Sequence, residues 1–339
     1  MSPTFSSASV VGGGSWGTAL AIHLARRGYD VPLWVHDPAR AEEMLTTREN
    51  RTYLPGFALP EGIRISTHLE AVLKEQGLVI WAVPARHCRE LFRSSAPWWH
   101  TQVRLVIATK GIEPETGLRM SEVARESLAS PPRAIAALGG PGFAREVARG
   151  DPTAGVLGCA DPVEGEMIQD ALSHGAYRFY TNSDLVGVEL GGAIKNVIAL
   201  AAGVVEGLGY GSNTSAALMT RGLSEITRLG VACGGSPSTF SGLAGMGDLV
   251  LTCTGRLSRN RSVGVQLGEG KGLDEILAGM KMVAEGIPTT TAALLLAGKK
   301  GIEMPITRSV AAVLAGRISA REALLELMNR PLKGEDSWG

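Results

Sequence analysis

The sequence predicts an α/β protein in two parts: a doubly wound parallel sheet over residues 1–182, followed by an all-α domain over residues 183–339. Two observations predict this class. In the first half, short apolar runs alternate with amphipathic stretches of helical period, which is typical of a parallel sheet with crossover helices. From about residue 183 the apolar period is helical almost throughout. No low-complexity linker separates the halves, so the change of period alone marks the predicted boundary.

The composition is that of a folded chain of two-domain size. The 339 residues include 33 Lys and Arg and 33 Asp and Glu, and 45% are hydrophobic. A net charge of zero gives no global field for nucleic acid or a membrane surface. The four cysteines lack C-x-x-C spacing and the six histidines form no ligand cluster, so we expect reduced thiols and no bound metal. MSPTFSS at the start has no export pattern, which leads us to expect a cytoplasmic protein.

The first predicted strand, residues 8–12, runs into a glycine-rich loop. Residues 12–17 read GGGSWG and match G-x-G-x-x-G, and the amphipathic stretch TALAIHLARRG follows them. A strand before and a helix after are the context that the dinucleotide fingerprint requires. Gly12, Gly14 and Gly17 allow a tight turn and a close approach to a pyrophosphate, whose charge the helix amides receive. We therefore expect a Rossmann-type sheet that binds NAD or NADP.

The second predicted strand, residues 30–35, ends at groups that bear on the choice of cofactor. Asp37 stands about 20 positions beyond Gly17, where an acidic residue usually bonds the ribose 2′-hydroxyl of NAD. His36 and Arg40 could instead receive the 2′-phosphate of NADP, with a solvated helix charge as the alternative for Arg40. The sequence leaves both cofactors open.

The rest of the first half continues the alternation. Further strands are predicted at residues 63–66, 78–83, 103–108, 133–138, 153–159 and 177–181, and helices at residues 85–94 and 162–173. Ligands of doubly wound sheets lie at the carboxyl ends of strands. One such end, ATKG, places Lys110 where it could reach a substrate or the nicotinamide, unless it is an ordinary loop lysine. Another, GGPGFA at residues 139–144, opens a helix and would present backbone amides to an anion or a cofactor.

The first helix of the second half carries an ammonium, Lys195, within the apolar run of residues 186–205. Burial of a lone cation costs free energy or lowers its pKa. Lys195 is therefore either a snorkelling lysine or a proton donor in a dry helix. Glu189 and Asn196 add polar groups on adjoining faces and interrupt the run, which disfavours a membrane span.

Polar groups also gather in two short segments between the later helices. Those helices are predicted at residues 213–229, 273–279, 288–298, 306–315 and 319–328. GMGDL places Asp248 in an otherwise apolar loop, where it could orient a lysine or bond a substrate hydroxyl. RLSRNR, residues 256–261, combines guanidinium, hydroxyl and amide groups that suit a phosphate, with a solvated basic loop as the alternative.

Taken together, these segments resemble the NAD(P)-dependent glycerol-3-phosphate dehydrogenases of the bacterial soluble type. The motifs that carry the resemblance are GxGSWGTAL, ATKG, GPxFAxE, VELGGAIKNVIALAAG, GLAGMGDLxLTC and SRNR, and they run in order from about residue 10 to residue 328. The resemblance implies reversible reduction of dihydroxyacetone phosphate to sn-glycerol 3-phosphate with NAD or NADP, at the entry to glycerophospholipid synthesis, by a homodimer.

The resemblance also implies roles for single residues. Lys195 matches the catalytic lysine, which gives a proton to the substrate C2 oxygen as hydride arrives, and Asp248 matches a carboxylate that holds this lysine. Lys110 matches a lysine that touches both substrate and cofactor. The other implied cofactor contacts are Gly12, Gly14, Ser15, Trp16, Gly17, His36, Ala144, Arg259, Val283 and Glu285. The other implied substrate contacts are Gly140, Gly142, Ser258, Arg259 and Asn260.

The chain departs from the family pattern in two segments. Members commonly read S-G-P-[ST]-F-A where this chain reads GGPGFA, so the hydroxyl expected at Gly142 is absent and any substrate contact there must come from the backbone amide. Trp16 is larger than the phenylalanine or tyrosine often found at its position, which a ribose or pyrophosphate face should tolerate.

Two other functions compete with this interpretation. A 3-hydroxyacid or 6-phosphogluconate dehydrogenase has the same architecture, but typically spaces the lysine and the following asparagine four residues apart, whereas Lys195 and Asn196 are adjacent here. A nucleotide-sensing protein without turnover is the second alternative. The joint presence of Lys110, Lys195, Asp248 and Arg259 argues against it.

Overall fold

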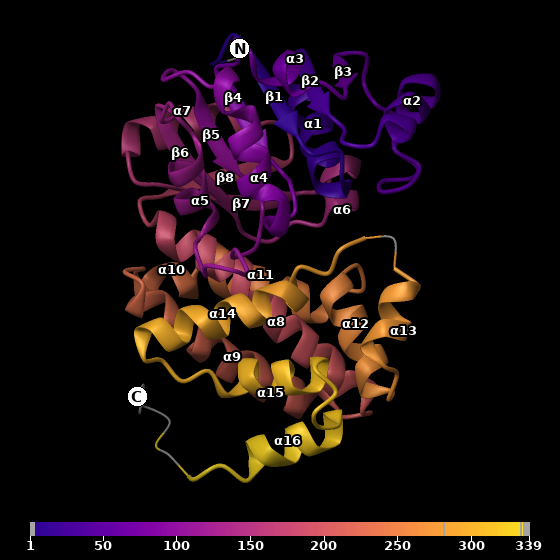
Figure 1. The fold of residues 1–339 in the computed structure, drawn as a ribbon, viewed down its shortest axis with the longest axis vertical. Helices are drawn as coiled ribbons and strands as arrows, with labels where there is room; N and C mark the ends of the chain where they lie inside the picture. The colour runs from indigo at the N-terminus through magenta and orange to yellow at the C-terminus, as the bar shows by residue number, and fades with distance from the viewer. Residues whose placement is uncertain (1–3, 281, 333, 335–339) are drawn as a thin grey trace. The chain divides into compact units, whose positions relative to one another are not determined.

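The structure, a computed structural model, describes residues 4–280, 282–332 and 334 and divides into two compact units (Figure 1). The first unit comprises the described residues up to Thr109 together with Met120–Val188. The second comprises Lys110–Arg119 and the described residues from Glu189 onward. The segment Lys110–Arg119 thus belongs to the helical unit, although its sequence lies within the α/β half.

The first unit is built on an eight-stranded sheet with the order β3-β2-β1-β4-β5-β6-β7-β8. The strands are β1 (Ala8–Val11), β2 (Val31–Trp34), β3 (Ile63–Ser66), β4 (Leu78–Trp81), β5 (Arg104–Ile107), β6 (Ala134–Gly139), β7 (Thr153–Cys159) and β8 (Tyr177–Asn182). All neighbouring pairs are parallel except β6 and β7. Strand β1 lies between β2 and β4, where the order reverses as in doubly wound nucleotide-binding sheets. The predicted fold class is confirmed, with one antiparallel pair in a mostly parallel sheet.

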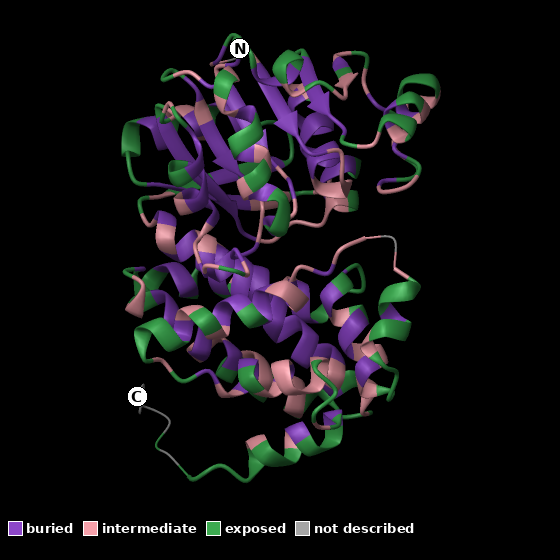
Figure 2. Cartoon of the chain, viewed as in Figure 1, coloured by how far each residue is buried: buried purple, intermediate pink, exposed green. Residues whose placement is uncertain are grey.

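The strands form the core of this unit because their apolar runs are continuous. Every residue of β1, β2 and β4 is buried (Figure 2). The helices of the unit are α1 (Ser15–Arg27), α2 (Pro38–Thr47), α3 (Leu69–Leu73), α4 (Ala85–Ser95), α5 (Met120–Ser127), α6 (Ala144–Arg149) and α7 (Pro162–Leu172). Helices α2, α3 and α5 were not predicted from the sequence, since each is only five to ten residues long.

The second unit is helical, as predicted. Its helices are α8 (Leu185–Gly207, from Glu189 onward), α9 (Ser212–Ala232), α10 (Pro237–Ser241), α11 (Asp248–Thr254), α12 (Arg259–Gly268), α13 (Leu273–Ala278), α14 (Gly286–Lys300), α15 (Pro305–Leu314) and α16 (Ala320–Met328). By length and composition alone α8 could cross a membrane, with a mean hydropathy of 1.6. However, 94% of that apolar window is buried inside the protein, as in the core helix of a globular unit.

Glycines let α8 and α12 approach until their backbones touch. A Cβ at Gly203 would stand 2.1 Å from the carbonyl oxygen of Arg261, and one at Gly264 would stand 2.0 Å from that of Leu200. One turn further along, a Cβ at Gly207 or at Gly268 would likewise collide with a backbone carbonyl oxygen of the other helix. Small residues spaced four apart permit such close helix contact. The start of α12 is therefore fixed relative to the middle of α8.

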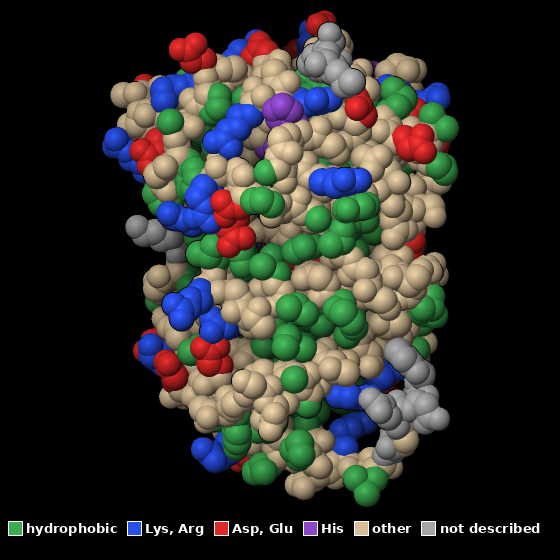
Figure 3. All heavy atoms as spheres, turned by 180° about the vertical axis from the view of Figure 1, so that it is seen from behind, with side chains coloured by type: hydrophobic (Ala, Val, Ile, Leu, Met, Phe, Trp, Pro, Cys, Tyr) green, Lys and Arg blue, Asp and Glu red, His purple; other side chains and the backbone are tan. Residues whose placement is uncertain are grey.

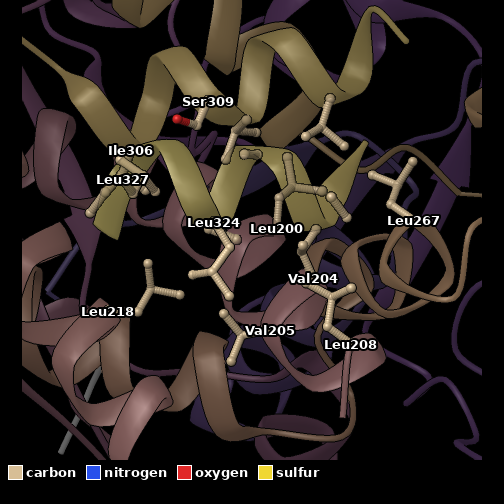
Figure 4. A pocket seen from close by; sticks show the side chains of 15 residues that line it. Leu200, Val204, Val205, Leu208, Leu218, Leu267, Ile306, Ser309, Leu324 and Leu327 are labelled. Carbon is tan, nitrogen blue, oxygen red and sulfur yellow. The ribbon is translucent and has the colours of Figure 1, made fainter. Parts of the chain in front are cut away.

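A small apolar cavity of about 50 Å³ lies in the helical unit (Figure 4). Its wall is almost wholly aliphatic and includes Leu200, Val204, Leu218, Ile306, Val310 and Leu324. On the exterior, charges of both signs are interspersed in small groups on the face shown in Figure 3, in keeping with the net charge of zero.

Candidate active site

Lys195 is buried and its ammonium donates to two side chains of α11. The residue is 5% exposed, so the snorkelling alternative is wrong. Its Nζ donates to Asp248 Oδ1 and, at 2.6 Å, to Thr252 Oγ1. The two partners stand four residues apart on one helix, which places both on the same face.

Asp248 is shared by two lysines. The carboxylate is completely buried, and Lys110 Nζ donates to its Oδ2 at 2.8 Å while Lys195 uses Oδ1. Burial lowers the pKa of Lys195 to about 8, Asp248 opposes that shift, and the Lys110 charge adds to it. Burial, with a second cation on the same carboxylate, therefore leaves a lysine that can gain or lose a proton near pH 8.

The local fold around Asp248 corrects the prediction of a loop. Leu243–Gly247 forms a π-helical turn, and Asp248 is the first residue of α11. A Cβ at Gly245 would stand 2.0 Å from the carbonyl oxygen of Phe240, and one at Gly191 would stand 2.6 Å from that of Ala244. Gly245, one of the glycines that suggested a loop, is required because the turn packs against its neighbours backbone to backbone. Single π turns often occur at functional sites.

A chain of side-chain amides joins the elements around Lys195. Asn196 Nδ2 donates to the carbonyl oxygen of Lys110 at 3.2 Å. Asn260 Nδ2 donates to Asn196 Oδ1 at 2.9 Å, and Asn260 Oδ1 accepts from the Gly286 amide at 2.9 Å. The start of α12 and the start of α14 are thereby tied to α8. Thr252 was not among the predicted site residues, although the spacing of the DLxLTC motif places it on the same helix face as Asp248.

The predicted phosphate-binding segment runs from an exposed turn at residues 256–257 into the beginning of a helix. Ser258 caps the ten-residue helix α12, and its Oγ accepts from the Arg261 amide at 3.2 Å. Asn260 is buried, whereas Arg259 is exposed and its Nη1 donates to the carbonyl oxygen of Val283 at 2.9 Å. The amides and the dipole of a helix start favour an anion. Val283 and Arg259, both predicted cofactor contacts, thus lie together, and Glu285 occupies the N-cap position of α14.

The glycine loop of the first unit has the form that its motif predicts. Gly12 has φ of +121°, and a Cβ there would stand 2.5 Å from the carbonyl oxygen of Ala82. A Cβ at Gly17 would stand 1.9 Å from the carbonyl oxygen of Gly12, whereas the space around Gly14 is open. Ser15 is the first residue of α1. Two glycines are thus required by the fold, and the third leaves room for a ligand beside the start of α1.

Other predicted contacts of the first unit cluster around its second glycine segment. Gly140 has φ of +89°, and a Cβ there would stand 3.2 Å from Gly155 Cα. The Trp16 ring lies 3.2 Å from the place of a Cβ at Gly142. Ala144 is the first residue of α6. The backbone of this segment therefore leads into a helix start, as the sequence predicted.

The end of β2 holds the groups that bear on the choice between NAD and NADP. Asp37 caps α2 through the amides of Ala39 and Arg40, at 3.0 and 3.4 Å, and also pairs with the Arg40 guanidinium at 3.3 Å. That guanidinium lies 4.3 Å from the centre of the Tyr53 ring, and His36 is exposed. The Asp37 carboxylate is thus engaged within the protein, while His36 faces solvent.

The predicted site residues fall into two groups, one in each unit. The second unit brings together Lys110, Lys195, Asp248 and Asn260, while the glycine loop and the end of β2 belong to the first. Within the described residues, no cluster of three or more His, Cys, Asp or Glu could hold a metal ion. A doubly wound sheet with a dinucleotide loop, joined in one chain to a helical unit with a buried lysine, defines an NAD(P)-dependent dehydrogenase.

Comparison with known proteins specifies the dehydrogenase. The profile described as "NAD-dependent glycerol-3-phosphate dehydrogenase N-terminus" matches residues 7–164, and the corresponding C-terminus profile matches residues 184–325. The chain belongs to the NAD-dependent glycerol-3-phosphate dehydrogenase family. The 3-hydroxyacid and 6-phosphogluconate dehydrogenase alternatives are therefore wrong.

Individual relatives align with this chain along nearly their whole length. The glycerol-3-phosphate dehydrogenase [NAD(P)+] of Geobacter sp. (strain M21) is 52% identical over 330 residues, which cover 96% of this chain and 98% of the relative. That of Nitratidesulfovibrio vulgaris is 50% identical over 328 residues, with 96% and 99% covered. The crystal structure of the Coxiella burnetii glycerol-3-phosphate dehydrogenase superposes with a TM-score of 0.93 at 37% identity, covering 97% of this chain and all of that one.

Proposed function

We propose that the protein catalyses the reversible, NAD(P)H-dependent reduction of dihydroxyacetone phosphate to sn-glycerol 3-phosphate. Relatives that are about half identical over almost the entire chain bear the name of this activity. The structural observation that carries the proposal is the buried Lys195 ammonium, held between Asp248 and Thr252 with a pKa of about 8.

Lys195 moves the proton in this proposal. The bound nicotinamide supplies the hydride to C2 of the substrate. The Lys195 ammonium gives its proton to the C2 oxygen, and the neutral amine takes it back in the oxidising direction. A pKa near the working pH allows one residue to serve both directions. Asp248 and Thr252 fix the direction in which the Nζ protons point.

Lys110 and the start of α12 would hold the rest of the substrate. The Lys110 ammonium adds positive charge beside Asp248, where it would stabilise the developing alkoxide. Ser258, Arg259 and Asn260 stand at the start of α12, whose amides and dipole suit the substrate phosphate. Gly140 and Gly142 are the remaining proposed substrate contacts, and Gly142 would act through its backbone amide.

The cofactor in this proposal is NAD or NADP, with its pyrophosphate at the glycine loop. The open space at Gly14 supports this placement. The other proposed cofactor contacts are Gly12, Ser15, Trp16, Gly17, His36, Lys110, Ala144, Arg259, Val283 and Glu285. We further propose a dinucleotide-binding domain over residues 1–182 and a catalytic domain over residues 183–339, with the segment Lys110–Arg119 packed in the helical unit.

The cellular setting is proposed from the resemblance and the cysteines. All four cysteines are present as thiols, which supports a cytoplasmic location. A homodimer that supplies glycerophospholipid synthesis is the assembly and the role that the resemblance implies.

One assay tests the activity directly. The absorbance of NADH and NADPH is followed with dihydroxyacetone phosphate, and in parallel with 3-oxoacids as control substrates. Oxidation of either cofactor by the triose phosphate alone is the expected result. Absence of oxidation with the triose phosphate would overturn the proposal.

A further inference from the structure

The segment Lys110–Arg119 folds as a hairpin of the helical unit. Ile112 and Arg119 form an antiparallel bridge, and the Glu113 amide donates to the carbonyl oxygen of Leu118 at 2.9 Å. At its tip, Lys299 Nζ of α14 donates to the carbonyl oxygen of Thr116 at 2.7 Å. The hairpin therefore has its own internal bonds and is tied to helices of that unit.

Both arms of the hairpin are held on α8. The carbonyl oxygen of Lys110 accepts from Asn196, and Arg119 Nη1 donates to Glu189 Oε2 at 2.6 Å. The Arg119 and Glu189 side chains are only 13% and 6% exposed. Loss of one partner of such a pair leaves an uncompensated buried charge, so the pair strongly constrains the chain around it.

The position of the hairpin determines which charged groups lie beside Lys195. Lys110, at the start of the hairpin, donates to Asp248 Oδ2 while Lys195 holds Oδ1. A neighbouring cation disfavours the ammonium form, and Lys110 is one of the groups that lower the pKa of Lys195. If the hairpin moved away, Lys195 would lose this repulsion and keep Asp248 to itself. Both changes would make Lys195 harder to deprotonate.

We propose that Arg119 and Glu189 are positioning residues for the reaction, whose ion pair holds the hairpin on α8 and so keeps the Lys110 ammonium on Asp248 beside Lys195. The inference rests on the proposed function, because it concerns the step in which Lys195 moves a proton. Neither Arg119 nor Glu189 needs to touch the substrate in this role.

Three variants of the full chain test the role. Arg119→Met removes the cation, Glu189→Gln removes the anion with almost unchanged shape, and Arg119→Lys keeps the charge. We expect the first two to lower kcat roughly 10- to 100-fold, the loss typical of a slightly misplaced catalytic group. We also expect the alkaline limb of their pH–rate profiles for dihydroxyacetone phosphate reduction to move to higher pH. Arg119→Lys should keep the wild-type limb.

Glu164→Gln is the matched control. Glu164 is a buried carboxylate of the first unit that pairs with Arg104 and Arg133, each at 2.8 Å. Its loss should lower the Tm without moving the alkaline limb. A limb that moves equally in Glu164→Gln would overturn the proposal, since general destabilisation would then explain the shift. An unmoved limb in Glu189→Gln, or an Arg119→Lys variant that behaves like Arg119→Met, would also overturn it.

A measurement without turnover separates this inference from the proposed function. NMR titration of the Lys195 Nζ signal in the wild-type chain and in Glu189→Gln follows the protonation of Lys195 directly. We expect titration at higher pH in the variant. An unchanged titration overturns the positioning role even if the enzyme is active, whereas a wild-type chain that oxidises neither NADH nor NADPH with dihydroxyacetone phosphate overturns the proposed function instead.

Discussion

The ring of Trp16 occupies the space into which a side chain at Gly142 would project. An added Cβ would stand 3.2 Å from Trp16 Cη2 and 3.6 Å from the Tyr177 hydroxyl oxygen. Trp16 and Gly142 are both positions at which the sequence departs from the pattern of the family it resembles. The departures are therefore coupled: a larger ring on α1 accompanies the missing side chain in the segment before α6.

This coupling predicts how exchanges at the two positions combine. Gly142→Ser alone should lower stability by about 1 kcal/mol, because a Cβ contact of this length forces the ring to shift. Trp16→Phe together with Gly142→Ser should recover most of that loss, since the smaller ring frees the space. Chemical denaturation of the single and double variants measures the interaction. Strictly additive effects would show that the two residues are independent.

Removal of the Lys195 amine should abolish turnover and leave the fold intact. Asp248 keeps its hydrogen bond from Lys110 in Lys195→Ala, so the carboxylate is not left alone. Loss of a general acid typically costs roughly 10²- to 10⁴-fold in rate. We expect a kcat decrease of at least that size with nearly unchanged NADH affinity, measured by fluorescence titration. Loss of NADH binding would instead make Lys195 a structural residue.

The two directions of the reaction should respond oppositely to pH. Burial lowers the pKa of Lys195 from 10.5 to about 8. The reduction needs the ammonium, so its kcat/KM should fall as pH rises through about 8. The oxidation needs the neutral amine, so its kcat/KM should rise over the same interval. Rate profiles in both directions between about pH 6 and 10 test this, because a general acid in one direction is the general base in the other. The same trend in both directions would exclude Lys195 as the proton carrier.

Much of this arrangement could be predicted because it depends on local patterns. The buried strands read as continuous apolar runs, and β3 and β7 begin and end where the sequence predicted. The glycine loop carries its own signature, and Lys195 stands out as an ammonium in an apolar helix. Each of these signals lies within one segment of the chain, where period and residue type suffice.

The rest depends on contacts between segments that are distant in sequence. Asp248 was expected in a loop because the glycines that precede it are typical of a turn. Gly245 is instead needed because a side chain there would collide with the carbonyl oxygen of Phe240. The association of Lys110–Arg119 with the helical unit rests on contacts such as the Arg119–Glu189 pair, whose partners are far apart along the chain. A pattern within one segment of the sequence does not indicate which distant residue a side chain will contact.

Arg40 should distinguish NADPH from NADH. Its guanidinium is held between Asp37 and the Tyr53 ring, at the end of β2 where the adenosine ribose of a dinucleotide lies. Arg40→Glu should weaken NADPH binding by roughly 10- to 100-fold, the value of a charge-assisted hydrogen bond to phosphate, and NADH binding much less. His36→Glu should act in the same direction. Arg178→Glu is the control, because Arg178 also stacks on an aromatic ring, that of Tyr180. Equal losses for both cofactors would remove Arg40 from 2′-phosphate recognition.

The apolar cavity of the helical unit predicts opposite effects of one substitution at two sites. Val310 lines the cavity on α15, whereas Val263 on α12 is completely buried and does not line it. Val310→Ile adds a methylene where space exists and should stabilise the protein by about 0.8 kcal/mol. Val263→Ile adds the same group to a filled core and should destabilise it by about 1–3 kcal/mol. Since both changes keep a β-branched side chain in a helix, helix propensity barely differs, and denaturation midpoints compare packing alone. A loss of stability in Val310→Ile equal to that in Val263→Ile would mean that the cavity cannot accept a methylene.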